Sequence, residues 1–108
     1  MDDTVICHIA IADDWEMSRG FGEYEVATRG VHLDETGFVH ATTPDRIDSV
    51  LAAVFGGLRL PLLRIDLSVP GLRGAGVEVA WVDGVPRIGG PIPMTDEVVL
   101  RETAIAVT

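Results

Sequence analysis

Apolar residues occur along this chain in short runs that alternate with polar positions, a pattern typical of β-strands. The run over residues 4–10 is rich in β-branched side chains, and residues 60–67 place Leu63, Ile65 and Leu67 on one face. Asp83-Gly84 separates two further runs and predicts a tight hairpin turn. The predicted strands cover residues 4–10, 21–28, 37–41, 60–67, 76–82, 85–88 and 97–107, with 21–28 as the weakest candidate.

Helical spacing is clearest after Thr43-Pro44, where a hydroxyl N-cap precedes a proline at the first helical position. Apolar residues then recur three or four positions apart, and Gly56-Gly57 ends the predicted helix. A shorter helix is predicted over residues 15–19, with Asp13-Asp14 as its N-cap and Gly20 as its end. The periodic residues of the main helix are Ile47, Val50, Leu51, Val54 and Phe55.

Two polar or Gly/Pro-rich segments, residues 32–36 and 69–75, are predicted to be loops, and Gly89-Gly90-Pro91 is predicted to be a rigid turn beside a cleft. The whole pattern predicts an α+β fold, with a mainly antiparallel sheet, one main helix and one short helix. A length of 108 residues corresponds to a single domain, 1–108.

Composition narrows the classes of function. Seventeen acidic residues against eight arginines give a net charge of −9, which argues against general nucleic-acid binding but not against an arginine that holds one phosphate. The start of the chain lacks the positive charge of a signal peptide, and no apolar run approaches the ~20 residues of a membrane span. We therefore expect a cytoplasmic monomer or weak homodimer with a small-molecule or nucleotide ligand and no membrane partner.

Two of the three histidines interrupt apolar strands. His8 shares strand parity with Ile6 and Ala10, and His40 shares it with Phe38 and Thr42. Each histidine alone has two interpretations: a hydrogen-bonded core residue, or a neutral imidazole that holds a polar ligand group or moves a proton. The small residues that follow both favour the second, so we predict that His8 and His40 meet in one pocket. His32, in a polar segment, is expected to be exposed.

Other candidates for chemistry are weaker. Cys7 is the only cysteine and lies between isoleucines, so a buried, inert thiol is expected. No histidine, cysteine and carboxylate group has the spacing of a metal site. Thr43 is better explained as a helix cap than as a nucleophile, and Trp15 and Trp81 are expected to pack in the core or to line a pocket wall.

Four blocks of the sequence stand out by their order and spacing: residues 5–10 (VICHIA), Asp14-Trp15, residues 22–24 (GEY) and residues 37–44 (GFVHATTP). Together with residues 62–66 and 90–93, they resemble the bacterial domain of unknown function 952 family over nearly the whole chain. That family is similar in fold to ADP-ribosyltransferases, which bind NAD in a central cleft within a split antiparallel sheet.

The resemblance implies that His8 hydrogen-bonds a ribose hydroxyl and that His40 lies against nicotinamide or the adjoining ribose. Tyr24 and Thr42 would border the cleft. Many ADP-ribosyltransferases also carry a glutamate for the ribose, for which Glu78 is a candidate. Arg87 and Gly89 replace a histidine and a tyrosine that are common in the family, and Arg87 adds an anion contact.

Three functions follow from these observations. The first is a protein that binds NAD or an ADP-ribose-like ligand through His8 and His40. The resemblance implies NAD as the cofactor, whereas the residues alone require no cofactor. The second is an isomerase, cyclase or hydrolase that acts on another small metabolite with a histidine as general acid or base. The third is a non-catalytic binding module, which the lack of a clear glutamate favours.

Overall fold

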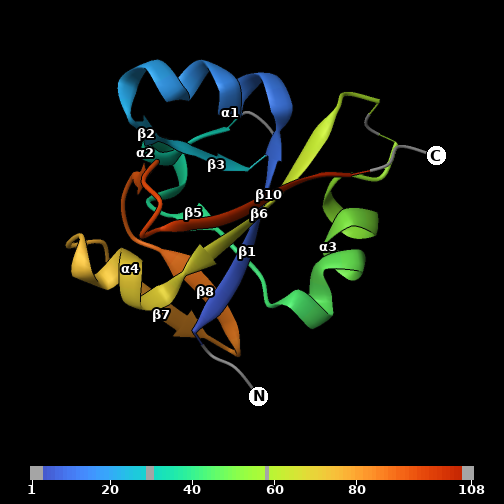
Figure 1. Cartoon of the computed structure of the whole chain (residues 1–108). Helices are drawn as coiled ribbons and strands as arrows, with labels where there is room; N and C mark the ends of the chain where they lie inside the picture. The colour runs from blue at the N-terminus through green and yellow to red at the C-terminus, as the bar shows by residue number, and fades with distance from the viewer. Residues whose placement is uncertain (1–3, 29–30, 58, 106–108) are drawn as a thin grey trace.

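The computed structural model describes residues 4–28, 31–57 and 59–105. Its elements form an α+β fold in which every strand pairing among these residues is antiparallel, as the sequence predicts. Figure 1 shows a three-stranded sheet crossing the molecule between helices α1 (Ala12–Ser18) and α3 (Ile47–Val54).

That central sheet has the strand order β1-β6-β10. Its strands are β1 (Val5–Ile11), β6 (Leu62–Ser68) and β10 (Val99–Ile105). The predicted strands over residues 4–10 and 60–67 are confirmed within one or two residues. The end of the third, residues 106 and 107, lies outside the described residues.

A second three-stranded sheet has the order β5-β8-β7. It contains β5 (Val39–His40), β7 (Val79–Val82) and β8 (Val85–Ile88). The predicted hairpin is confirmed, because Asp83 and Gly84 both take positive φ angles, 52° and 78°, between its two strands. Two small ribbons pair β2 (Glu23–Tyr24) with β9 (Ile92–Pro93) and β3 (Val26–Thr28) with β4 (Val31–His32).

Side chains of β1 alternate between two apolar cores on the two faces of the central sheet. Ile6 and Ala10 pack with Trp15 and Tyr24, while Cys7 and Ile9 pack against α3. The strand is buried on both faces, which explains its nearly continuous run of apolar residues. The cluster on the α3 side also includes Ile47, Phe55 and Leu62.

Helix ends differ from the sequence prediction at both predicted helices. α1 begins at Ala12, so Asp13 and Asp14 lie in its first turn instead of capping it. The helix then continues as a 3-10 turn over Arg19–Phe21 and ends at Gly22, which has a left-handed φ of 75°, instead of at the predicted Gly20. Thr43 occupies the cap position before a 3-10 turn over Pro44–Arg46, but its hydroxyl makes no cap hydrogen bond.

Both predicted loops contain helices. Residues 32–36 form the end of β4 and the short helix α2 (Leu33–Thr36), for which His32 accepts a cap hydrogen bond from the Asp34 amide. Residues 69–75 contain α4 (Val69–Gly74), capped by Ser68. The strand predicted to start at residue 76 consequently starts at Val79, after a turn in which Gly76 has a φ of 84°.

Candidate functional site

The candidate site lies where the two three-stranded sheets separate. Cys7 of β1 and Thr42, just after β5, exchange two backbone hydrogen bonds of 2.8 Å and form an isolated antiparallel bridge. One residue further along β1, the connection between the strands is a side-chain hydrogen bond, because Nδ1 of the His8 imidazole lies 2.6 Å from the carbonyl oxygen of His40. A side chain therefore connects the strands beyond the point where backbone pairing ends.

The hydrogen-bond partners of His8 determine its tautomer. A carbonyl oxygen only accepts, so Nδ1 carries the proton and donates to His40. Nε2 must then accept from the hydroxyl of Tyr24, which lies 3.0 Å away. Burial lowers the pKa of His8 to about 4, so the ring is neutral near pH 7.

His8 is only 1% exposed, and both of its ring nitrogens have protein partners. This is the arrangement expected of a hydrogen-bonded core histidine, and it fixes the position of the His40 backbone. The ribose contact that the family resemblance implies for His8, and its role as a general acid or base, stay predictions.

His40 differs from His8 because its ring is only partly buried and belongs to a row of planar side chains. It stacks on Phe38 with ring centroids 4.8 Å apart and planes inclined by 25°. The guanidinium of Arg87 lies over the same phenyl ring, 4.4 Å from its centroid. Burial, and next the charge of Arg87, lower the pKa of His40, which favours a neutral imidazole at pH 7.

Two cavities border this row. A small one of about 30 Å³ is lined by His8, His40, Thr42 and neighbouring apolar residues. A wider depression of about 260 Å³ lies beside it and has a largely apolar wall. His40, Ala41 and Val50 line both cavities, which are therefore neighbours, and we call the two together the His40 cleft. The remaining residues of the wider depression are Phe38, Val54, Val85, Pro86 and Arg87.

The structure brings some predicted site residues together and separates others. His8, His40, Thr42 and Arg87 all border the His40 cleft. Tyr24 is 1% exposed and lies behind His8, so it reaches the cleft only through that ring. Glu78 is exposed just before β7 and lines neither cavity; its backbone oxygen accepts from the Gly89 amide. The Gly89-Gly90-Pro91 turn, predicted to lie beside the cleft, lines neither cavity.

Phe38 and the apolar wall residues of α3 and β8 were not predicted as site residues. The shared parity of Phe38 and His40 was the available signal, since it places both rings on one side of the segment that enters β5. The contribution of Val50 and Val85 could not be found this way, because it depends on how α3 and β8 approach β5 in space.

The other candidates behave as structural residues. Cys7 is fully buried, as predicted, and donates from Sγ to Asp66 at 3.2 Å. Burial and this contact raise its pKa to about 12, which favours the protonated thiol; its inertness stays a prediction. Trp15 is fully buried, whereas Trp81, expected to pack or to line a pocket, is 38% exposed. His32 is exposed, as predicted, and pairs with Glu25 at 3.0 Å.

Across the described ranges, no group of three or more histidine, cysteine or acidic residues is placed to hold a metal ion. No helix there is long and apolar enough to cross a membrane.

Fold and site together define a small α+β protein with two antiparallel sheets that separate at a histidine-containing cleft. Comparison with known families makes this more specific: the chain belongs to the family described as protein of unknown function (DUF952), whose profile matches residues 9–93.

A solved structure of the same fold is protein CC0527 from Caulobacter crescentus, at 20% sequence identity and a TM-score of 0.76. The match covers 97% of this chain and 89% of that one. A double methionine mutant of that protein matches with a TM-score of 0.75, also at 20% identity and with the same coverage of both chains. No curated protein matches the sequence.

Proposed function

We propose that the His40 cleft binds a small nucleotide-type ligand, for which NAD and ADP-ribose are the leading candidates. The proposal includes the inference that the separated antiparallel sheets correspond to an ADP-ribosyltransferase-like arrangement. The observation that carries it is the row formed by Arg87, Phe38 and His40 beside an apolar depression of about 260 Å³.

Each part of the row suits one part of such a ligand. The apolar wall and the aromatic rings offer surface to a planar base or nicotinamide ring. The guanidinium of Arg87 is exposed on β8 and makes no ion pair within the described residues, so its N–H groups can hold a phosphate. A neutral His40 can donate to or accept from a ribose hydroxyl.

Calorimetric titration with NAD and with ADP-ribose tests the proposal. We expect saturable binding by the wild type and at least roughly ten-fold weaker binding by Arg87→Ala, because a charge-assisted contact to phosphate is worth about 1.5–3 kcal/mol. Arg59→Ala is the matched control, since Arg59 is also exposed but lines neither cavity. Absence of binding, or equal affinity in Arg87→Ala, would contradict the proposal.

The residues that line the His40 cleft favour binding of NAD without its turnover. No carboxylate lines the His40 cleft in the described part of the chain, and Glu78 lies elsewhere. Stabilising a ribosyl cation in the transition state calls for a nearby negative charge, so we expect no release of nicotinamide from NAD. If nicotinamide is released from NAD by the wild type and not by Glu78→Gln, the result would support a transferase instead.

A second candidate is a histidine-dependent isomerase, cyclase or hydrolase. The position of His40 favours it, since its ring is only half-buried and borders both cavities, where an imidazole can exchange a proton with a bound molecule. Turnover of a small metabolite that disappears in His40→Ala, while the variant still folds, would favour this function over simple binding.

A further inference from the structure

A groove of about 500 Å³ lies between the end of α1 and the strands β2, β3 and β4. Figure 1 shows α1 beside β2 in this part of the molecule. We call it the Phe21 groove, and it shares no lining residue with the His40 cleft. The residues that line it are Ser18, Phe21, Glu23, Glu25, Val26 and His32.

The groove contains an aromatic side chain that is almost fully open to solvent. Phe21 is 84% exposed, and Met17, on the preceding helical turn, is 73% exposed. Among the described residues, these are the two most exposed large apolar side chains. Exposed apolar side chains that are bordered by polar residues are typical of a surface that binds another protein.

The polar residues of the groove are mainly acidic. Tyr24 is buried, so its neighbours Glu23 and Glu25 are exposed on the opposite side of the strand. Glu25 accepts a hydrogen bond from His32 at 3.0 Å. The Glu23 carboxylate makes no hydrogen bond or ion pair with the residues that the structure describes, so it is available to a partner.

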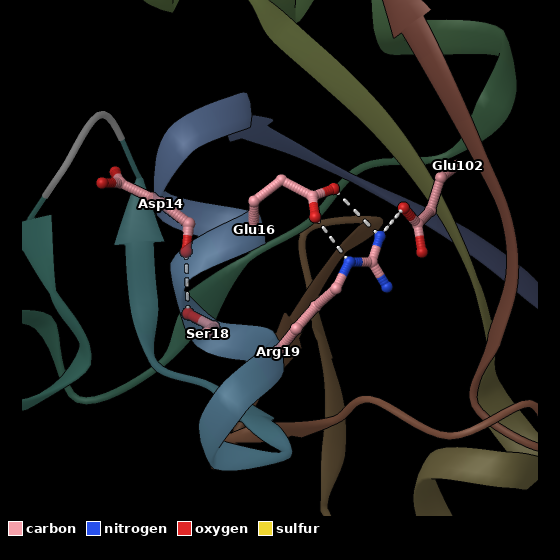
Figure 2. Close-up of polar contacts among 5 residues, drawn as sticks. All are labelled: Asp14, Glu16, Ser18, Arg19 and Glu102. Atoms are coloured by element: carbon pink, nitrogen blue, oxygen red, sulfur yellow. Dashed lines mark hydrogen bonds and ion pairs between the residues drawn. The ribbon is translucent and has the colours of Figure 1, made fainter.

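The nearest arginine in the sequence does not neutralise these carboxylates. Figure 2 shows the guanidinium of Arg19 between Glu16 of α1 and Glu102 of β10. Arg19 does not line the Phe21 groove, and neither does any other arginine within residues 4–28, 31–57 and 59–105. The groove therefore presents two carboxylates beside an exposed phenyl ring.

We propose that the Phe21 groove is a docking site for a basic peptide segment of another protein, one that carries arginine next to aliphatic residues. A guanidinium is planar, so it can stack on the Phe21 ring and donate to the Glu23 carboxylate. Aliphatic side chains of the partner would cover Val26 and the rest of the phenyl ring. The net charge of −9 also attracts a basic partner and repels an acidic one.

Calorimetric titration of the whole chain with the peptide acetyl-RRLLRR-amide tests the proposal. Side chains of an extended peptide alternate between two sides, so each side of this probe presents arginine, leucine and arginine. We expect saturable binding with one peptide per chain. Two further probes, acetyl-RRSSRR-amide without leucine and N-acetylargininamide without a peptide chain, should bind at least roughly five-fold more weakly, because each lacks apolar contact area.

Variants at exposed positions connect the binding to the groove. Phe21→Ala should weaken binding of acetyl-RRLLRR-amide at least roughly five-fold, and Glu23→Gln roughly three-fold, as expected for a stacked cation and an exposed ion pair. Leu60→Ala and Glu97→Gln are the matched controls, because both residues are exposed and lie outside the groove. Thermal unfolding at the wild-type temperature verifies that each variant is folded.

The proposal is independent of the nucleotide cleft, because its probes and its variants involve no residue of that cleft. Three results would overturn it: no saturable binding of acetyl-RRLLRR-amide, equal affinity for N-acetylargininamide or for the serine-containing peptide, or affinities of Phe21→Ala and Glu23→Gln that equal those of their controls. Equal affinity for N-acetylargininamide would indicate a site for a small cation in place of a docking surface.

Discussion

At the scale of single residues, His8 is the key to how the site is held together. The path from Tyr24 through both nitrogens of His8 to the His40 carbonyl uses every donor and acceptor of the ring. The strand that carries His40 is thus fixed by an uncharged imidazole in a place without access to water. The free energy of unfolding should therefore depend on the charge state of the His8 side chain.

The pH dependence of unfolding follows from the lowered pKa of His8. The unfolded chain takes up the proton near pH 6.5, whereas the folded protein resists it until about pH 4. The contribution of neutral His8 to the free energy of unfolding is complete above pH 6.5. It is lost as the pH falls from 6.5 to 4, which lowers the free energy of unfolding by about 3 kcal/mol. Urea unfolding at pH 7 and pH 4 measures it.

His8→Asn provides the comparison, since the amide can still donate to the His40 carbonyl but does not titrate. The carboxylates of both proteins titrate in the same range, so the difference between the two pH profiles isolates His8. Identical profiles for wild type and variant would show that His8 is not buried in its neutral form.

The sequence predicts residue positions better than residue roles. Strand parity correctly places Phe38 and His40 on one face. The predicted proximity of His8 and His40 also occurs, through a contact between the His8 ring and the His40 backbone. The partners of His8 could not be predicted, because Tyr24 and the His40 carbonyl come from 16 and 32 positions away along the chain. Whether a strand histidine is free or fully bonded depends on those distant groups.

At the scale of elements, α4 shows how tertiary contacts override local propensity. Its sequence, Val69-Pro70-Gly71-Leu72-Arg73-Gly74, predicts a loop because proline and two glycines disfavour helix. The helix forms because Ser68 caps it and Pro70 lies in its first turn, while Val69 and Leu72 are buried in the core.

The two glycines of α4 should respond to alanine in opposite ways. A Cβ at Gly71 would lie 2.0 Å from the backbone oxygen of Glu97, so Gly71→Ala should destabilise the protein by about 3 kcal/mol. Gly74 has open space around it, and Gly74→Ala should stabilise by about 0.5 kcal/mol. Chemical unfolding of both variants checks the contrast, which equal effects would contradict.

Turns and helices with a strong local sequence pattern are the elements that the sequence predicts best. The Asp83-Gly84 hairpin occurs as predicted. The main helix after Pro44 also forms, but its α-helical part starts at Ile47, after a 3-10 turn. The short strands β2, β4 and β9 have only two residues each, and their existence depends on pairing across the fold. Local pattern carries little information about such pairs.

At the scale of the whole molecule, the cleft results from how the two sheets meet. The bridge between Cys7 and Thr42 joins the two sheets, and the space beside it is bordered by α3 and by β8. With a net charge of −9, the molecule as a whole repels anions, so an anionic ligand depends on the local charge of Arg87.

The central claim is that a nucleotide-type ligand occupies the His40 cleft, and mapping by ¹H–¹⁵N spectra with ADP-ribose tests it most directly. The account predicts saturable shifts concentrated on residues 38–42, 50–54 and 85–87, which border the cleft. It predicts little change around the Phe21 groove. No shifts, or shifts centred away from the cleft, would contradict it.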